Sequence, residues 1–531
     1  MKKIIIVVLV ILQFFMTGCK KFLDTRSNDF LTPNMDYSSV QLARQALNGC
    51  MLNLRSQWMF SGWWQARGIA NTEDGVTTIV NVVYSPATLL SDATDVNLAS
   101  RWTNCYQAIQ RCNFLLDQMQ KSSLDSASKA PIIGVALFLR GFYYFILADE
   151  WGAVPLRLAP TAGPADKALA RSPVAAVYAQ ILKDMETAEK MVPAADVPGY
   201  GGAGYPSRST VQGMLARVCL TMAGAPLHDA SKYQEANKWA QKVMNSGLHE
   251  LNPSFQQVFI NYIADKYDPK ESLWELDNNV ATAGTPLGCH LGYLDGPVSN
   301  VPDTGVMVGQ VFPTRILYNM YQAKDQRRDW VICPYSYGNN SGNGARTNWS
   351  ATQIYERNMG LYRLNYSLPP HITQSTPVNW PFLRYSDVLL MIAEAENAVS
   401  GGPTPLAYSC INQVRRRAWG KLQAGAGDPE EADLAANLDQ AAFLQAVQNE
   451  RLMELAYQGL RRHDLIRWGL YEQTLQKMKN DVNDASQPAV NATRKNFITT
   501  IVNNYQPRDT LWPVPVIELQ QNSLCTQNPG F

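Results

Sequence analysis

Six stretches between residues 39 and 243 share one pattern, in which apolar side chains recur every three or four residues and small residues lie among them. The clearest of them, residues 174–188, places its apolar side chains on one face of a helix. The others are residues 39–58, 102–119, 137–148, 211–222 and 233–243. Prolines such as Pro155 and Pro193 mark turns between them. Because short helices of this kind bury their apolar faces by stacking as hairpins, we predict a mainly α fold, a tetratricopeptide-like helical-repeat superhelix.

The pattern changes between residues 274 and 380, which are rich in Gly, Asn, Pro and aromatic residues and have no sustained period. The run GNNSGNG at residues 338–344 is typical of a loop or tight turn. Helical patterns resume over residues 383–395 and 443–459. Since loops held on a rigid frame commonly carry binding sites, we expect this large irregular, loop-rich insertion to face a ligand. The expected parts are a helical-repeat scaffold at 39–273, the aromatic insertion at 274–380 and a C-terminal helical part at 381–531.

Charge and aromatic content narrow the class of partner. The 531 residues include 46 Lys and Arg against 45 Asp and Glu, so there is no basic excess of the kind that nucleic-acid binding uses. Only 17% of residues are charged, below the roughly 25% of average domains, whereas Tyr numbers 24 and Trp 13. An exposed aromatic ring can stack on the apolar face of a sugar while polar groups bind its hydroxyls. The composition therefore favours a partner that is apolar on one face and rich in hydroxyls.

The first residues have the proportions of an export signal. Met1-Lys2-Lys3 precedes an apolar run from Ile4 to Met16, which is too short to cross a bilayer. Thr17-Gly18-Cys19 then resembles a bacterial lipobox. We expect residues 1–18 to be a lipoprotein signal peptide, Cys19 to be lipidated, and residues 19–38 to form a tether to the membrane. The alternative is an ordinary secretory signal with an incidental cysteine. No later segment is expected to span a membrane.

The eight remaining cysteines do not define a metal site, because no CxxC motif is present. Cys105 and Cys112 lie seven residues apart on one predicted helix, about 10.5 Å along its axis. A disulfide needs Cα atoms within about 7 Å, so these two cannot pair with each other. Cys219 falls on an apolar helix face and is expected in the core. The pairing of the other cysteines stays open.

Four segments in the second half of the chain resemble one protein family. They are LRYSDVLLMIAEA at 383–395, INQVRRRA at 411–418, ERLMELAYQG at 450–459 with its continuation to Gly469, and the end from Pro513 to Phe531. Each is similar to a conserved segment of the SusD/RagB nutrient-uptake lipoproteins of Bacteroidetes. Near the front, CKKFLD at 19–24 and FLRGFYYF at 138–145 are similar to the same family. The aromatic insertion is the part of this chain that is least similar to the family.

The resemblance implies a fold and a role. The fold would be a tetratricopeptide-like superhelix with a ligand-facing region built from long loops. The role would be that of a cell-surface lipoprotein, anchored in the outer membrane and facing the exterior. Its partners would be an oligosaccharide and a SusC-type TonB-dependent outer-membrane transporter, on which it would sit as a lid. Members of the family are not themselves enzymes, and we expect no nucleic-acid partner.

Other chemical motifs have weaker support. Glu450 and Glu454 share a helix face and could form a glycoside-hydrolysing pair, but the arginines among them favour an ion-pair network between helices. GYGGAG at 199–204 matches a nucleotide-binding spacing, yet it lacks a preceding strand and lies between predicted helices. The five histidines are scattered. We expect no cofactor; calcium is the one cation that the Asp- and Asn-containing loops could hold, although no EF-hand spacing supports it.

The candidate ligand-binding residues are aromatic side chains in predicted loops, together with one carboxylate for a sugar rim. They are Trp63, Trp64, Asp74, Tyr84, Tyr293, Trp330 and Trp349, with Tyr335 and Tyr337 as further candidate platforms. For each ring, the alternative is a role in core or loop packing. For the whole chain, the alternatives to oligosaccharide capture are peptide capture by the same architecture, a lipid-anchored glycan hydrolase and a periplasmic helical-repeat scaffold.

Overall fold

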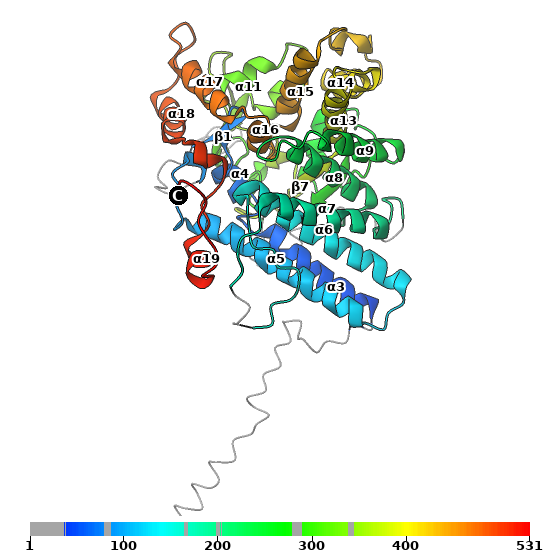
Figure 1. Cartoon of the computed structure of the whole chain (residues 1–531). Helices are drawn as coiled ribbons and strands as arrows, with labels where there is room; N and C mark the ends of the chain where they lie inside the picture. Colours follow the sequence, from blue (N-terminus) through cyan, green and yellow to red (C-terminus); the bar gives the residue numbers. More distant parts are fainter. Residues whose placement is uncertain are drawn as a thin grey trace, which may run out of the picture.

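The computed structural model describes residues 37, 39–78, 86–163, 168–197, 202, 204–278, 289–337 and 345–531. Within them the chain is mainly helical, which confirms the predicted fold class (Figure 1). Cys19, Tyr84 and the 199–204 motif, apart from Gly202 and Gly204, lie outside the described residues.

The N-terminal scaffold is a stack of helices in which each long helix packs against the next along the chain (Figure 1). These are α3 (Val40–Met51), α5 (Val96–Lys121), α6 (Ser126–Trp151), α7 (Val174–Met191), α8 (Arg208–Ala223) and α9 (Lys232–Asn245), followed by the shorter α10 (Phe255–Ile263). All six predicted helical stretches are present. The first is shorter than predicted, because α3 ends at Met51 and gives way to a 3-10 turn at Leu52–Arg55.

The C-terminal helices continue this stack although about 120 residues separate them from α10. Helix α13 (Tyr385–Val399) packs on α9, and both α14 (Pro405–Ala418) and α15 (Gln440–Leu455) pack on α13. The chain then forms α16 (Arg461–Arg467), α17 (Tyr471–Asn483), α18 (Ala492–Asn504) and α19 (Val516–Gln521). The superhelix is therefore assembled from both sides of the insertion.

A short antiparallel sheet joins the two ends of the insertion. Strand β3 (Ser272–Leu276) pairs with β7 (Trp380–Arg384), with Leu276 opposite Trp380 and Ser272 opposite Arg384. The predicted helix start at Leu383 is wrong, because Leu383 belongs to β7 and α13 begins two residues later. The sheet packs on the scaffold: the Trp274 ring stacks on Phe382 at 4.1 Å between centroids and meets the edge of Phe142 on α6 at 4.9 Å.

Within the described part of the insertion, regular structure is sparse. Strand β4 (Val311–Phe312) pairs with β2 (Gly75–Thr77), which pairs with β1 (Asn71–Thr72), so the insertion is tied to the early loop. Strands β5 (Tyr335–Tyr337) and β6 (Arg346–Asn348) form a separate pair. Two short helices, α11 (Arg315–Met320) and α12 (Arg328–Val331), lie between β4 and β5.

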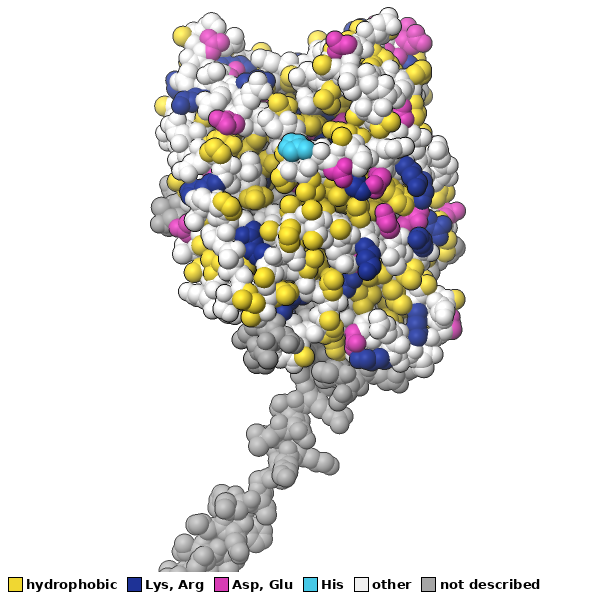
Figure 2. All heavy atoms as spheres, in the orientation of Figure 1, with side chains coloured by type: hydrophobic (Ala, Val, Ile, Leu, Met, Phe, Trp, Pro, Cys, Tyr) yellow, Lys and Arg dark blue, Asp and Glu magenta, His cyan; other side chains and the backbone are white. Residues whose placement is uncertain are grey.

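Helix α6 is both long and strongly apolar. It is long and apolar enough to cross a membrane by length and composition, contrary to the expectation that no later segment would be. However, 78% of its most apolar window is buried by neighbouring helices. This burial is typical of a core helix. Figure 2 shows hydrophobic side chains gathered over the middle of the face that Figure 1 presents.

The C-terminal segment closes back on α6. The Trp512 backbone amide donates to the Glu150 carbonyl at 2.8 Å, and the Trp151 indole donates to the Pro513 carbonyl at 3.0 Å. The Asn528 side-chain amide donates to the carbonyls of Trp151 at 3.1 Å and Trp512 at 2.8 Å. The last turn of α6 is therefore completed by residues more than 360 positions later.

The eight described cysteines are all buried and unpaired. Cys105 and Cys112 lie on the same helix, α5, and do not pair with each other, as their spacing predicts. Cys219, on α8, has no exposed surface and lies in the hydrophobic core, also as predicted.

Replacing Gly224 by alanine is expected to lower the free energy of unfolding by about 1–3 kcal/mol. Gly224 caps α8, and a Cβ there would lie 2.2 Å from the backbone oxygen of Arg467 at the end of α16. The matched control is Gly49→Ala on α3, where a Cβ meets nothing within 4 Å, and where alanine should stabilise the helix. Urea unfolding of both variants measures the difference; equal effects would contradict close packing at Gly224.

Candidate functional site

Aromatic side chains from the early loop and from the insertion meet in one group. The Trp63 ring, at the start of α4 (Trp63–Arg67), lies 5.8 Å from the Trp58 ring and 5.7 Å from the His290 ring. His290 in turn lies 6.3 Å from Tyr293. Trp58, Trp63 and Tyr293 are each half-buried, so part of each ring reaches solvent. We call these four residues the Trp63–Tyr293 group.

A backbone contact holds this group together. The His290 amide donates to the Ser61 carbonyl at 2.8 Å, which docks the insertion on the early loop. The approach depends on Gly62, because a Cβ there would lie 2.8 Å from the His290 backbone carbon. Gly62 also has φ of 108°, a conformation that favours glycine. The local backbone is thus built to place residues 61–63 against residues 290–293.

A cavity of about 210 Å³ is linked to the segment that carries Tyr293, although none of the four residues of the group lines it. Residues 305–306 and 364–377 form most of its wall, and Asp265 and His371 contribute polar atoms to it. Thr376, which also lines it, donates its hydroxyl to the Leu291 carbonyl at 2.8 Å and so links the cavity wall to the segment that carries Tyr293. Burial raises the pKa of Asp265. A concave site with a few polar groups next to exposed rings is the usual form of a ligand-binding pocket.

A second aromatic cluster lies on the β5–β6 pair. The guanidinium of the exposed Arg346 lies 4.3 Å from the Tyr335 ring centroid, and that of Arg363 lies 4.4 Å from the Trp330 ring centroid. The Trp330 ring also lies 5.5 Å from the ring of Tyr366. These cation–π contacts hold Arg346 and Arg363 against the rings of the cluster. Trp349 is half-buried, and its backbone amide donates a hydrogen bond to the Pro334 carbonyl at 2.8 Å, which joins it to the cluster.

Three predicted site residues lie in the interior. Trp64 is 1% exposed, packs on Trp512 and carries the Arg101 guanidinium 4.2 Å from its ring centroid. Asp74 is 6% exposed and accepts hydrogen bonds from the Thr72 hydroxyl and, at 3.0 Å, from the Tyr457 backbone amide.

Trp330 is 2% exposed beneath Arg363. The expectation that these three side chains are exposed is therefore wrong: each has a partner from a distant segment that encloses it. Tyr335 and Tyr337 are likewise buried. The structure brings Trp63 and Tyr293 together and leaves parts of Trp63, Tyr293 and Trp349 exposed.

Sequence reasoning missed the residues that connect the rings. His290 bridges Trp63 and Tyr293, and Trp58 extends the group. Arg346 and Arg363 hold the second cluster. The sequence signals were the closeness of Trp58 to Trp63 and of His290 to Tyr293, whereas the approach of His290 to Trp63 depends on segments far apart in the chain.

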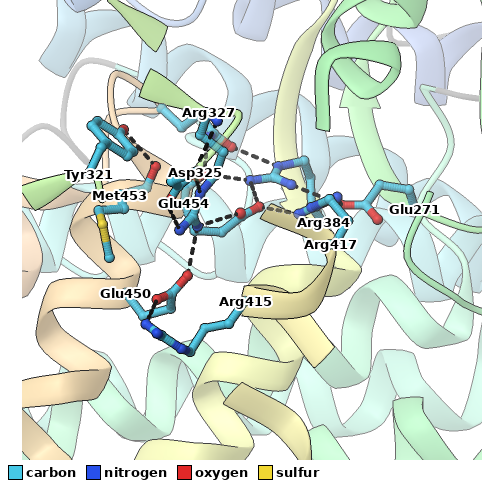
Figure 3. A network of polar contacts seen from close by, with 11 residues as sticks. Glu271, Tyr321, Asp325, Arg327, Arg384, Arg415, Arg417, Glu450, Met453 and Glu454 are labelled. Atoms are coloured by element: carbon cyan, nitrogen blue, oxygen red, sulfur yellow. Dashed lines mark hydrogen bonds and ion pairs between the residues drawn. The ribbon is translucent and has the colours of Figure 1, made fainter. Parts of the chain in front are cut away.

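The carboxylates of Glu450 and Glu454 belong to a buried ion-pair network, as the sequence predicts (Figure 3). Glu454 contacts Arg417 at 2.5 Å, Arg384 at 2.8 Å and Arg327 at 3.1 Å. Burial alone would raise the pKa of Glu454, but these three arginines outweigh burial and lower it to about 2. Glu450 contacts Arg327 at 2.7 Å.

This network does not resemble a hydrolytic pair. Glycoside hydrolysis requires one carboxyl group that is protonated and reaches the substrate, whereas Glu454 is held ionised and has no exposed surface. The network instead joins β7, α14 and α15 around one charge centre. In the described part of the chain, no group of three or more His, Cys, Asp or Glu side chains is arranged to hold a metal ion.

The fold and the loops define a helical-repeat protein that carries a large aromatic insertion. A family model described as the SusD family matches residues 270–531, and one described as starch-binding associating with outer membrane matches residues 62–220. The chain therefore belongs to the SusD/RagB family, as the sequence motifs indicated.

Full-length relatives agree with this assignment. SusD-like protein P25 from Formosa agariphila is 24% identical over 561 residues, which cover 98% of this chain and 98% of the relative. SusD-like protein P2 from the same organism is 25% identical over 444 residues, which cover 81% of this chain and 80% of the relative.

Solved structures share the fold. A SusD homologue from Bacteroides thetaiotaomicron superposes with a TM-score of 0.83 at 24% identity, over 94% of this chain and 98% of its own. A laminarin-binding SusD-like protein superposes with a TM-score of 0.69 at 20% identity, over 93% of this chain and 100% of its own. Surface glycan-binding protein A from Bacteroides fluxus superposes with a TM-score of 0.70 at 20% identity, over 93% of this chain and 100% of its own.

Proposed function

We propose that this protein is a cell-surface lipoprotein that binds an oligosaccharide and passes it to a SusC-type TonB-dependent transporter for import. The observation that carries the proposal is the Trp63–Tyr293 group, in which half-buried rings from two distant segments meet. Thr376 links this group to a cavity whose wall includes Asp265 and His371. Partly exposed rings offer the flat faces on which the C–H face of a sugar stacks. The family and the glycan-binding structural neighbours support a glycan as the ligand.

The proposal includes an anchor and a site. Cys19 carries the lipid that holds the chain to the outer membrane, with residues 19–38 as the tether. Trp63 and Tyr293 are the stacking residues, and Trp349 in the β5–β6 cluster is a further ligand-binding residue; Tyr84 is also proposed to bind ligand, although it lies outside the described residues. The protein binds without turnover, needs no cofactor and presents its ligand on the exterior side.

Peptide capture is the second candidate. The insertion offers backbone groups as well as rings, and a peptide would be held mainly by backbone hydrogen bonds rather than by stacking. A glycan and a peptide therefore differ in how strongly binding depends on Trp63 and Tyr293.

Replacing Trp63 or Tyr293 by alanine is expected to weaken oligosaccharide binding by about 10- to 100-fold, since one stacked ring contributes about 1.5–3 kcal/mol when its burial is included. Calorimetric titration of the protein lacking residues 1–18 against panels of oligosaccharides and peptides provides the measurement. Trp419→Ala is the matched control, because Trp419 is also half-buried but lies at the end of α14.

Two outcomes would contradict the proposal. Saturable peptide binding with no oligosaccharide binding would favour peptide capture. Shorter oligosaccharides appearing after incubation would show hydrolysis and contradict a binding role.

A further inference from the structure

A second cleft lies on the scaffold, away from the insertion. It has a volume of about 670 Å³ and is formed by α5, the segment around residues 157–161 and α19. None of its lining residues belongs to the Trp63–Tyr293 group or to the β5–β6 cluster. It shares no lining residue with the cavity near residues 364–377.

The floor of the cleft is aromatic. Tyr106 is half-buried, and its ring lies 5.0 Å from the buried Trp102 ring beneath it. The Tyr106 hydroxyl donates to the Pro155 carbonyl at 2.9 Å, which fixes the ring between α5 and the segment that follows α6. An aromatic ring held in this way offers a preformed apolar surface at little entropic cost.

The rim carries donors and acceptors on both sides. On one side, the Gln110 carbonyl oxygen accepts from the backbone amide of Thr161 at 3.1 Å and from its hydroxyl at 3.2 Å, which orients the amide group. The exposed Arg111 donates to the Gly49 carbonyl at 3.0 Å, so its guanidinium is also held in place.

On the other side, α19 supplies a carboxylate and an amide. Glu518 accepts from the Trp102 indole at 3.4 Å and from the Asn522 side chain at 2.8 Å, and Gln521 is exposed beside it. The rim therefore combines amides, a carboxylate and a guanidinium around an aromatic floor.

We propose that this cleft is a second saccharide-binding site. The rim contains amide, carboxylate and guanidinium groups, which together donate and accept hydrogen bonds. A ligand rich in hydroxyl groups also donates and accepts, so it matches this rim better than a purely anionic or purely apolar ligand does. The Tyr106 ring lies on the floor, where a pyranose C–H face would stack. The site is preformed, because most of these side chains are fixed by the scaffold before a ligand arrives.

Hydrogen–deuterium exchange of the protein lacking residues 1–18 tests the proposal. The probes are laminarihexaose, maltohexaose, cellohexaose and oligogalacturonate at millimolar concentration. We expect at least one probe to slow exchange in residues 155–161 and 516–521. Thr103→Trp should abolish this protection, because Thr103 is exposed on α5 and lines the cleft. Gln120→Trp is the control, since Gln120 is exposed on the same helix outside the cleft.

A second variant keeps the test valid if Thr103→Trp does not fold. Gln110→Ala combined with Gln521→Ala removes two rim amides and is expected to weaken binding at the cleft at least fivefold. The proposal is overturned if no probe protects these segments, or if protection persists unchanged in the folded Thr103→Trp protein.

The same experiment separates the two sites. Trp63→Ala and Tyr293→Ala should leave protection at residues 155–161 and 516–521 intact while removing protection near residues 289–293. Protection at the cleft with none near 289–293 in the unmodified protein would support the second site and contradict the proposed loop site.

Discussion

Replacing Glu454 by glutamine is expected to lower the free energy of unfolding by about 3–5 kcal/mol, because it leaves buried cations without their counter-charge. The Glu454 carboxylate has no exposed surface and pairs with Arg327, Arg384 and Arg417, which are themselves almost fully buried. Glutamine keeps the volume but removes the charge. Urea unfolding followed by tryptophan fluorescence measures the loss.

Glu431→Gln is the matched control for this prediction. Glu431 also contacts two cations, Lys324 at 2.8 Å and Lys421 at 2.7 Å, and they lower its pKa to about 2. However, its side chain is 45% exposed, so solvent and salt screen the pairs, and the unfolding midpoint should not change. If the two variants behaved alike, the network around Glu454 would not be a stabilising centre.

Stability is expected to pass through a maximum near pH 4–5. Arginines outweigh burial and lower the pKa values of Glu454 and Asp464 to about 2 in the folded protein. Their contribution is present above the unfolded pKa values, near 4, and is lost as the pH falls towards 2. At roughly 1.4 kcal/mol per pKa unit, Asp464 should contribute about 2.5 kcal/mol and Glu454 about 3.5 kcal/mol to the free energy of unfolding.

Two other carboxyl groups act in the opposite direction. Burial raises the pKa values of Glu275 and Asp295 to about 7, so the folded state favours their neutral forms. Their contribution to the free energy of unfolding is present below pH 4 and is lost as the pH rises through 7. Stability should therefore fall on both sides of the maximum.

Chemical denaturation at a series of pH values between 2.5 and 8 measures the fall in stability on the acid side and on the alkaline side of the maximum. Glu454→Gln should flatten the acid limb, and Asp295→Asn should reduce the slope between pH 5 and 8. A stability that rises steadily from pH 5 to 8 would contradict the assignment of neutral, buried Glu275 and Asp295.

The scaffold was predictable because its information is local. The apolar stripe at residues 174–188 is α7, and the arginines interleaved with Glu450 and Glu454 form the expected ion-pair network. Leu383 was not predictable in the same way. It continues a helical pattern, but pairing with β3, more than 100 residues earlier, places it in a strand.

The site was predictable as a region but not residue by residue. Trp63 and Trp64 are neighbours on one short helix, and adjacent side chains on a helix point about 100° apart. Which of them faces inward is decided by Trp512 and Arg101, which enclose Trp64. No local pattern contains that information, and the same holds for Asp74, which Tyr457 encloses.

The closure of the C-terminal segment on α6 has a consequence for the order of folding. The carbonyls of Glu150 and Trp151 find their partners in residues 512–528, so the early helices cannot finish packing while the chain is still emerging. Contacts at such large sequence separation form slowly. If residues 1–18 direct export, as expected, the last turn of α6 gains these partners only once nearly the whole chain has crossed the membrane.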